Sequence, residues 1–535
     1  MDYKIMQGNS LLEQYEGIDL SNLTKLETYQ GEGFQTTIFG SETDIKRQKL
    51  QYLIGEYYNC TNHTVKKKIK QKIEENIDNQ LSINQLTNTL KEIDTEANPY
   101  FFLWHTWFSD VFNSVSDRNG FDIVIGNPPY VNISIMPQMH SVFREIYSEI
   151  HTGYNDLMYY FLYKGICLLS DEGILAFITS NYFLGNDYAK KLRSFLNDKL
   201  EIVINFHNAS VFESASVHTA ISFARKSCKT DAVKFYTYQK DKLYSVILND
   251  DYEYCELNRN KLNDTWVIAN DKKHSIIDKL KQDSIVLGDL MIIEQGSKSG
   301  KNNVFTISKE YAEKQNFEKE VYRTNVKNSD IQQYIFTDRG NVVIYTDSQT
   351  NINKYPNVYK YLQSHQEELS ERNEVGKGLY PWWRFDRPRN KAIFDSKEKI
   401  IVPYRAKNNR FAYDDKQCFN DGGDIRALIV KKDCKYSIKF LLGLLNSTLL
   451  DWYYGFIGKP KGNMREYFNA PLSELPIHVA TSTQQTPIIA LVDRILAAKK
   501  SNPQADTSGL EREIDKLVYR LYGLTEKEIN LIEGK

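Results

Sequence analysis

The stretch FDIVIGNPPY, residues 121–130, decides the fold of the N-terminal half of this chain. Its first six residues form an apolar, β-branched run that predicts a buried parallel strand. Gly126 lets the backbone turn tightly where that strand ends. Asn127 to Tyr130 are therefore expected at the carboxyl edge of a sheet, which is the edge at which open α/β sheets bind their ligands.

Two consecutive prolines make this turn rich in hydrogen-bond acceptors. Pro128 and Pro129 carry no backbone N–H, so the turn offers carbonyl oxygens and the Asn127 amide without competing donors. The Asn127 side-chain oxygen and the Pro128 carbonyl can hold the two N–H bonds of an aromatic amine in its nucleophilic form. Tyr130 can stack on the ring that carries the amine. The alternative is an ordinary β-turn, where Asn and Pro are common for local reasons.

Residues 121–131 resemble motif IV of the amino-methyltransferases. They are most similar to the gamma-class adenine-N6 DNA methyltransferases, including the Eco57I-like enzymes of type IIG restriction-modification systems. The resemblance implies a site-specific enzyme that transfers a methyl group from S-adenosylmethionine to adenine N6 of a base flipped out of double-stranded DNA. It implies catalytic roles for Asn127, Pro128, Pro129 and Tyr130, and no metal site.

Length and composition limit the class of protein. A chain of 535 residues is too long for one core, so several domains are expected. A net charge of −1 neither demands nor excludes nucleic acid as a partner. The sequence has no run of 18 apolar residues and begins without a signal or transit pattern, which predicts a cytoplasmic protein. Its six cysteines lack metal-ligand spacing and are expected to be reduced thiols.

Strands and helices alternate on both sides of the central stretch. Residues 173–179 and 200–206 predict further buried strands, and a helix is expected from residue 158 to 169. The alternation predicts a doubly wound, Rossmann-like α/β sheet. Residues 151–157 resemble motif V of the family. Asn9, at the end of a first predicted strand, resembles the motif III residue that contacts the adenine of the methyl donor; a plain strand end is the alternative.

A second aromatic residue is expected to face Tyr130. Residues 210–213 and 217–223 predict a hairpin-like pair of apolar segments, which resembles motif VIII of the family. The resemblance gives Phe212 the role of stacking on the target base from the face opposite Tyr130. Such a clamp offsets part of the stacking that a flipped adenine loses. The alternative for Phe212 is plain core filler.

The glycine-rich loop that should bind the methyl donor is missing from the expected place. Gly31-Glu32-Gly33 follows no apolar strand and has no third glycine, so a donor loop is not predicted there. The chain thus resembles the C-terminal portion of a methyltransferase, and a donor-binding half is expected on an upstream segment or a separate subunit. Two rivals stay open: a non-catalytic subunit that only recognises a DNA sequence, and a methyltransferase of RNA or protein amides.

The C-terminal half resembles a target-recognition domain. Aromatic residues alternate with arginines from residue 380 to 389 and again after residue 399, a pattern that can stack on bases and bind phosphate or guanine edges. Arginines that solvate a sheet edge are the alternative. The candidate DNA-binding residues are Lys298, Lys301, Trp382, Trp383, Arg384, Arg387, Arg405, Lys407, Arg410, Lys459 and Lys461.

These patterns predict three parts. Residues 1–280 would form an incomplete methyltransferase domain with a helical insertion at 42–95. Residues 281–478 would form an α+β target-recognition domain that contains an apolar helix at 438–454, and residues 479–535 a helical tail.

Overall fold

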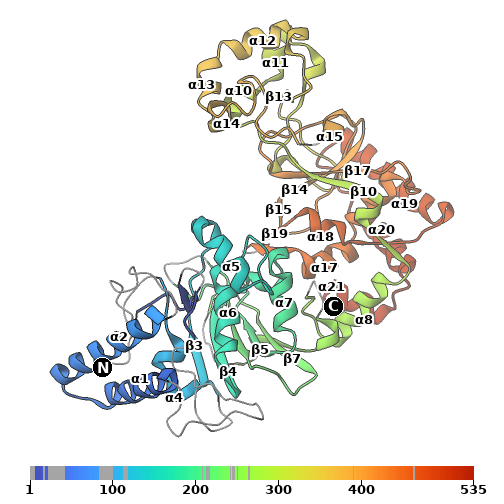
Figure 1. Cartoon of the computed structure of the whole chain (residues 1–535). Coiled ribbons are helices and arrows are strands. Elements are labelled where there is room, and N and C mark those ends of the chain that lie inside the picture. Colours follow the sequence, from blue (N-terminus) through green and yellow to red (C-terminus); the bar gives the residue numbers. More distant parts are fainter. Residues whose placement is uncertain are drawn as a thin grey trace. The chain divides into compact units, whose positions relative to one another are not determined.

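The computed structural model divides the chain into two compact units, residues 1–264 and 265–535, which are described one at a time (Figure 1). The domain limits predicted at 280 and 478 stay predictions. The structure describes residues 7–15, 18–21, 42–83, 100–112, 119–207, 209–212, 217–240, 242–243, 248–249, 251–262, 266–389, 391–461 and 464–535.

A mixed sheet forms the centre of the first unit. Its strand order is β3-β4-β6-β5-β7-β8. β3 runs parallel to β4 and β5 runs parallel to β7, whereas β6 lies antiparallel between β4 and β5. This mixed α/β architecture confirms the predicted fold class. The strands are β3 (Phe121–Gly126), β4 (Leu169–Ser180), β5 (Leu200–Asn205), β6 (Thr219–Ala224), β7 (Ala232–Tyr238) and β8 (Tyr252–Asn258).

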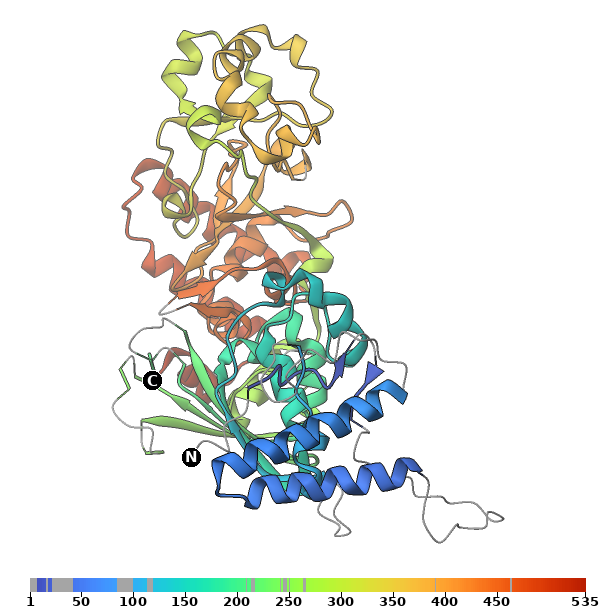
Figure 2. The ribbon, with the colours of Figure 1, turned by 60° about the vertical axis from the view of Figure 1, so that its left-hand side comes forward.

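Helix α6 (Leu157–Cys167) packs on β4 and presents a nearly continuous buried face to the sheet. The predicted helical insertion forms two helices that lie side by side, α1 (Glu42–Asn59) and α2 (His63–Ile83) (Figure 2). The remaining elements of the unit are β1 (Gln14–Tyr15), β2 (Ile18–Asp19), α3 (Trp104–Trp107), α4 (Ser109–Phe112), α5 (His140–Ile146) and α7 (Lys190–Leu196).

The sheet differs from the prediction at one place. Residues 217–223, predicted as one half of a hairpin, lie largely in β6, which inserts between β4 and β5 and pairs with both. After residue 226 the chain continues the sheet with β7 and β8. In β7 the buried residues Val233 and Phe235 alternate with polar or half-buried ones, so the period-two pattern of a strand was present in the sequence.

Four small sheets organise the second unit: β10-β17-β14-β16, β11-β13-β12, β15-β19-β18 and β20-β9. Neighbouring strands in these sheets run antiparallel over the part of the unit that the structure describes. The strands are β9 (Ser284–Val286), β10 (Met291–Gln295), β11 (Thr306–Ser308), β12 (Tyr322–Thr324), β13 (Asn341–Ile344), β14 (Lys399–Pro403), β15 (Arg405–Ala406), β16 (Ala412–Asp414), β17 (Ile425–Val430), β18 (Lys459–Lys461), β19 (Met464–Glu466) and β20 (Pro476–His478).

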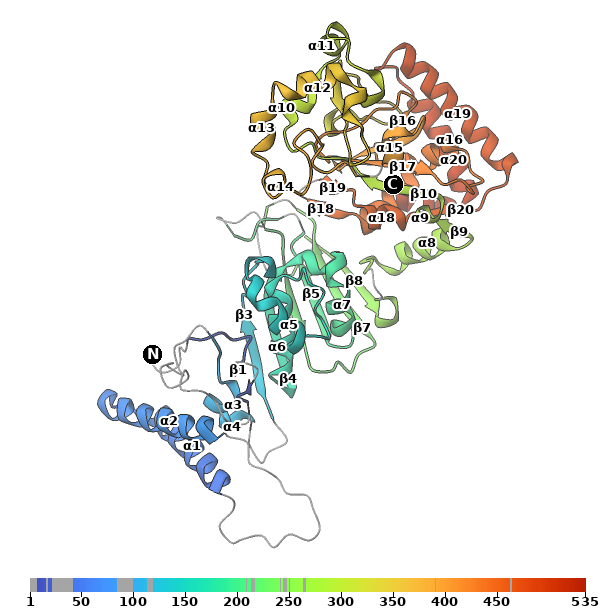
Figure 3. The same cartoon turned by 45° about the horizontal axis from the view of Figure 1, so that its top comes forward.

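Two apolar cores hold these sheets together with helices. One surrounds β11, β12 and β13, and the other includes the C-terminal helices, of which α16, α19 and α20 lie side by side (Figure 3). The helices are α8 (Asp271–Lys281), α9 (Leu287–Leu290), α10 (Asn302–Phe305), α11 (Lys309–Lys314), α12 (Pro356–Gln363), α13 (Gln366–Ser370), α14 (Asn373–Gly376), α15 (Lys391–Asp395), α16 (Ile438–Leu445), α17 (Thr448–Ile457), α18 (Asn469–Ser473), α19 (Ser482–Ser501), α20 (Ser508–Leu521) and α21 (Glu526–Glu533).

The single helix predicted at 438–454 is wrong, because the chain forms two helices, α16 and α17. Ser447 caps the second one: its hydroxyl accepts a hydrogen bond from Leu450 N. Asn446 holds the break in place by bonding both the N–H and the carbonyl of Phe411, at 2.9 and 2.8 Å. Among the described residues, no helix is both long and apolar enough to cross a membrane.

Candidate active site

The turn after β3 has the shape that its sequence predicts. Asn127 and Pro129 are exposed, whereas Pro128 is buried beneath them. A Cβ atom at Gly126 would lie 3.1 Å from the ring of Phe177 on β4, so a larger residue would push the turn away from the sheet. The Asn127 amide is thereby held out at the carboxyl edge of the sheet.

Tyr130 and Phe212 lie opposite each other at this edge. Their ring centroids are 6.5 Å apart and their planes are inclined by 55°. The Tyr130 hydroxyl donates to the carbonyl of Ile178 at 3.2 Å, which ties the ring to β4. Burial raises the pKa of Tyr130 to about 12, so the phenol stays protonated. The structure thus brings together two residues that are far apart in the sequence.

The loop before α6 holds the segment that follows the turn. Asn132 donates to the carbonyl of Tyr154 at 2.9 Å, and Ile133 N donates to the carbonyl of Asn155 at 3.0 Å. Leu157 N donates to the carbonyl of Val131 at 2.7 Å. This loop lies in the stretch predicted to resemble motif V, and its contacts fix the chain directly after Tyr130.

Two cavities flank the turn. One, of about 270 Å³, is lined by Asn9, Pro129 and Phe161 among others. The second, of about 240 Å³, is lined by Asn127, Pro128, Pro129 and again Phe161. The structure therefore places Asn9 beside the turn, on the wall of the first cavity. Phe161 was not among the predicted site residues, although it follows Leu157, another lining residue, at the i,i+4 spacing of one helix face.

A buried carboxylate stands behind the second cavity. Glu13 accepts hydrogen bonds from His105 N at 2.7 Å and lies 2.8 Å from His105 Nδ1 and 3.5 Å from Lys164 Nζ. The His105 ring also packs against Phe112, with the centroids 4.4 Å apart. Lys164 lines the cavity and is held by Glu13. These contacts join the N-terminal segment to α6.

β3 forms an edge of the sheet. Within the described residues it pairs with β4 alone. Ile123 and Ile125 on this strand are 68% and 80% exposed, which is unusual for isoleucines of a parallel strand. The candidate turn therefore continues from a strand whose apolar side chains are uncovered.

In the second unit, two separate basic stretches meet. Lys298 N donates to the carbonyl of Arg387 at 3.1 Å, and Arg387 N donates back to the carbonyl of Lys298 at 2.8 Å. Both residues are exposed. Lys301, by contrast, forms ion pairs with Glu371 at 3.0 Å and Glu368 at 3.8 Å.

The predicted aromatic residues of this stretch are half-buried. Trp382 and Trp383 pack against the core around β11, β12 and β13, and the Trp382 ring lies 5.9 Å from that of Tyr359. The Arg384 guanidinium lies over the Tyr380 ring, 4.6 Å from its centroid. The Arg387 side chain is 56% exposed, and its Nε lies 3.7 Å from the Asp386 carboxylate.

A second group of predicted cations surrounds one buried carboxylate. The Glu466 side chain on β19 is 4% exposed and accepts from Arg405 Nε at 2.8 Å and Nη2 at 2.6 Å. Lys459 Nζ lies 3.7 Å from its other oxygen. Hydrogen bonding to Glu466 raises the pKa of Arg405.

The other predicted cations of this group differ in their surroundings. Lys407 is exposed, and its carbonyl accepts two bonds from Arg465. Arg410 is half-buried and lies 3.5 Å from the carbonyl of Arg405. Lys461 ends β18, and its side chain lies outside the part that the structure describes.

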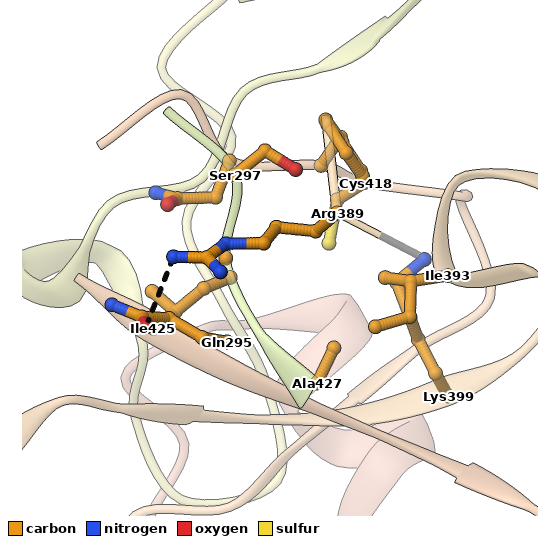
Figure 4. Close-up of a pocket in the computed structure, with 11 residues that line it drawn as sticks. Gln295, Ser297, Arg389, Ile393, Lys399, Cys418, Ile425 and Ala427 are labelled. Carbon is orange, nitrogen blue, oxygen red and sulfur yellow. Dashed lines mark hydrogen bonds between the residues drawn. The ribbon is translucent and has the colours of Figure 1, made fainter. Parts of the chain in front are cut away.

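A small cavity in the second unit is lined by Arg389, Lys399 and Cys418 among others (Figure 4). Its volume of about 10 Å³ has room for about one water molecule and for no larger ligand. Arg389 extends along it toward Gln295, at 3.5 Å. Lys399 lines the same cavity and forms a buried ion pair with Asp414 at 2.8 Å. Cys418 also donates to Asp414, and its burial raises the pKa of the thiol well above the usual value.

Comparison with known proteins defines the class. Residues 18–212 match the model of the Eco57I restriction-modification methylases, and residues 329–477 match the model of the TaqI-like C-terminal specificity domain. The chain therefore carries an Eco57I-like methylase domain followed by a TaqI-like specificity domain, which confirms the predicted resemblance.

Individual relatives agree with this class. The type II methyltransferase M.HindII of Haemophilus influenzae is 25% identical over 430 residues, which cover 75% of this chain and 82% of the relative. The type II restriction enzyme and methyltransferase RM.Eco57I of Escherichia coli is 24% identical; the match covers 63% of this chain and 38% of that protein. The type IIL restriction-modification enzyme MmeI, solved in complex with DNA, shares the fold at 16% identity and a TM-score of 0.55, over 86% of this chain and 63% of MmeI.

Proposed function

We propose that this chain methylates adenine N6 in double-stranded DNA as part of a restriction-modification system, with residues 1–280 carrying the chemistry and residues 281–478 reading the sequence. The observation that carries the proposal is the pair Tyr130 and Phe212, whose rings face each other beside Asn127. Because DNA is the proposed substrate, we infer a cytoplasmic location.

The pair has nearly the spacing that a flipped base needs. A base stacked between two rings lies about 3.4 Å from each ring, which is the rise per nucleotide of a DNA strand. The two rings must therefore be about twice that distance apart. The observed 6.5 Å between the centroids approaches that sum, and a rotation of Phe212 would remove the 55° inclination. Phe212 lies on a half-buried loop, whereas Tyr130 is fixed by its bond to Ile178. We infer that Tyr130 is the fixed wall of the base site and Phe212 the adjustable one.

Asn127 and Pro128 would orient the amine. An adenine held against Tyr130 points its amino group at the exposed Asn127 side chain and at the Pro128 carbonyl, both acceptors. Accepting both N–H bonds draws the nitrogen lone pair out of the ring and stabilises the positive charge that develops on nitrogen during transfer. After the transfer, the methylated nitrogen loses its extra proton to solvent through the same exposed edge.

The cavities beside the turn fit the adenosine part of S-adenosylmethionine. Asn9 can bond a purine edge and Phe161 offers a ring, while the rest of the lining is largely apolar. When bound, S-adenosylmethionine supplies the methyl group. The candidate turn shares Pro129 with this cavity, so donor and acceptor sites would adjoin. We also propose that a donor-binding segment, on the same or another polypeptide, covers β3, because Ile123 and Ile125 are exposed.

Asn127→Ala is expected to lower the rate of methylation by about a hundredfold or more, the effect of losing one preorganised partner of the transition state, and to leave DNA affinity unchanged. Asn127→Asp keeps an acceptor oxygen and should retain more activity than Asn127→Ala. The measurement is transfer of labelled methyl groups by the chain supplied with its donor-binding half. Full activity in Asn127→Ala would remove the role given to this turn.

Tyr130→Ala and Phe212→Ala are each expected to cost about 1–3 kcal/mol of stacking on the flipped base. A duplex in which the target adenine faces an abasic site should rescue both variants, because the base is already unpaired. It should not rescue Asn127→Ala, whose defect is chemical. Equal rescue of all three variants would contradict the separate roles.

A second candidate function is DNA recognition without catalysis, which the uncovered edge of β3 favours. In that case the chain binds DNA and shows no methylation with any donor-binding segment. Calorimetry with S-adenosylmethionine distinguishes the two. The catalytic proposal expects weak binding by the chain alone and tight binding after the donor-binding segment is added, whereas the recognition-only alternative expects no change.

A further inference from the structure

A second pair of aromatic residues lies exposed beside the candidate active site. Tyr154 belongs to the loop before α6, and Tyr188 to the short 3-10 turn Asp187–Ala189 after β4. They are 60% and 48% exposed, yet their ring centroids are only 5.2 Å apart, with planes inclined by 45°. Two large rings that touch each other and face solvent offer an apolar surface on which a base could stack.

Tyr154 is bonded to the segment that contains the turn, and Tyr188 contacts the loop that carries Tyr154. Asn132, two residues after Tyr130, donates to the carbonyl of Tyr154 at 2.9 Å. The Thr152 hydroxyl lies 3.1 Å from the carbonyl of Tyr188. The backbones of the pair are therefore fixed relative to the turn while the rings stay open. The pair lies at the same carboxyl edge of the sheet as the proposed base site.

Two basic side chains lie near the loop that carries Tyr154. Burial lowers the pKa of His151 in this loop, and the charges of His140, Arg144 and Lys191 lower it further. Lys191 Nζ donates to the carbonyl of Ser148 at 3.4 Å. Arg144 and Lys191 are exposed. Asp187, the acidic neighbour of Tyr188 in the chain, is paired with Lys190 at 3.7 Å.

We propose that Tyr154 and Tyr188 form a second aromatic platform, which binds the nucleotides that flank the target base on the same DNA strand. This inference rests on the proposed function and names a further contact of the same site. Rotating a base out of a duplex removes stacking from its neighbours, and exposed aromatic rings replace that stacking without reading sequence. Arg144 and Lys191 would bind the adjoining phosphates.

The test compares two substitutions at the same positions. Tyr154→Leu with Tyr188→Leu keeps an apolar side chain and removes the rings, whereas Tyr154→Phe with Tyr188→Phe keeps the rings. The probe is a duplex that the wild-type full chain selects from a random pool, with 2-aminopurine substituted at each position in turn. We expect the leucine pair to bind about tenfold more weakly, the fold-change of one lost base–ring contact. It should also lose the fluorescence response beside the target adenine, and the phenylalanine pair should keep both properties.

The chain offers a matched control. Tyr236 and Tyr254, on β7 and β8, lie with their centroids 5.1 Å apart at 47°, and Tyr254 is 46% exposed. This pair belongs to the strands at the opposite edge of the sheet from β3. Replacing both with leucine should leave affinity and fluorescence unchanged.

Three results would overturn the inference: an unchanged leucine pair, an equal loss in the phenylalanine pair, or an equal loss in the control pair. A wild-type chain that binds no duplex would overturn this inference together with the proposed function. If the Tyr154 and Tyr188 variants behave as expected but Asn127→Ala methylates at the full rate, the catalytic proposal alone is overturned.

Discussion

Asn155 is a fully buried polar residue that fixes the course of the chain after the Asn127–Tyr130 turn. Its side-chain oxygen accepts from Thr152 N and Thr152 Oγ1, both at 2.7 Å, and its amide donates to the carbonyl of Ile150 at 2.9 Å. Its backbone carbonyl accepts from Ile133 N at 3.0 Å. A buried amide with these bonds is costly to replace, because its partners would be left unpaired.

His151, next in this loop, predicts how stability depends on pH. Burial lowers its pKa below the ordinary value of 6.5, so it is neutral in the folded chain near neutrality. In the unfolded chain His151 binds a proton as the pH falls below that value. In the folded chain it stays neutral until the pH reaches its lowered pKa. Its contribution to stability is therefore present above pH 6.5 and is lost as the pH falls toward the folded pKa.

We expect the urea midpoint of the first unit to fall between about pH 7 and pH 5, and to fall less in His151→Gln, which cannot titrate. The midpoint is read from fluorescence unfolding curves at several pH values. An equal fall in both proteins would show that other groups, and not His151, carry the dependence.

At the scale of elements, the C-terminal helices belong to a core of the second unit. Asp515 on α20 accepts from Thr448 N at 2.8 Å and from Thr448 Oγ1 at 2.6 Å, and so ties α20 to the start of α17. Residues of α19 and α20 share the core with α16 and α17. The helical tail predicted from the sequence is thus joined to this core by both polar and apolar contacts.

Gly443 on α16 allows α19 to approach. A Cβ atom there would lie 2.8 Å from a methyl group of Ile488 and 3.1 Å from one of Val492. Gly443→Ala is therefore expected to lower the free energy of unfolding by about 1–3 kcal/mol through overpacking. Gly509→Ala, in α20 with nothing within 4 Å of its Cβ position, should be neutral or stabilise by up to about 1 kcal/mol.

Chemical denaturation of the two glycine variants beside the wild type measures the difference. If Gly443→Ala proves as stable as Gly509→Ala, the contact between α16 and α19 is looser than the structure indicates.

At the scale of the whole molecule, a net charge of −1 means that DNA affinity depends on local cations. Arg387 is one of the exposed cations, and its backbone is bonded to that of Lys298. Arg387→Ala is expected to weaken binding and to reduce the slope of log affinity against log salt by about 0.9, the value for one phosphate contact. Titrations at several salt concentrations measure the slope.

Lys432→Ala, which removes an equal charge from an exposed turn, is the control and should leave the slope unchanged. Arg405→Ala is less informative than Arg387→Ala, because it also leaves the buried Glu466 with Lys459 alone at 3.7 Å. A slope that does not respond to Arg387→Ala would assign this residue to the solvated surface.

The sequence by itself determined the features that depend on neighbouring residues. The apolar run before Gly126 specified a strand and its end, and the prolines specified the turn, because both act through local backbone preferences. The alternation of strands and helices specified the α/β class.

Only the tertiary structure decided which distant side chains meet. The 6.5 Å between Tyr130 and Phe212, the cavity that Phe161 shares with Asn9, and the pairing of Arg405 with Glu466 each join segments from different elements. The insertion of β6 between β4 and β5 likewise replaced the predicted hairpin. Such contacts arise from how sheets and helices pack against one another. Local periodicity specifies which face of an element is apolar, but it does not specify what covers that face.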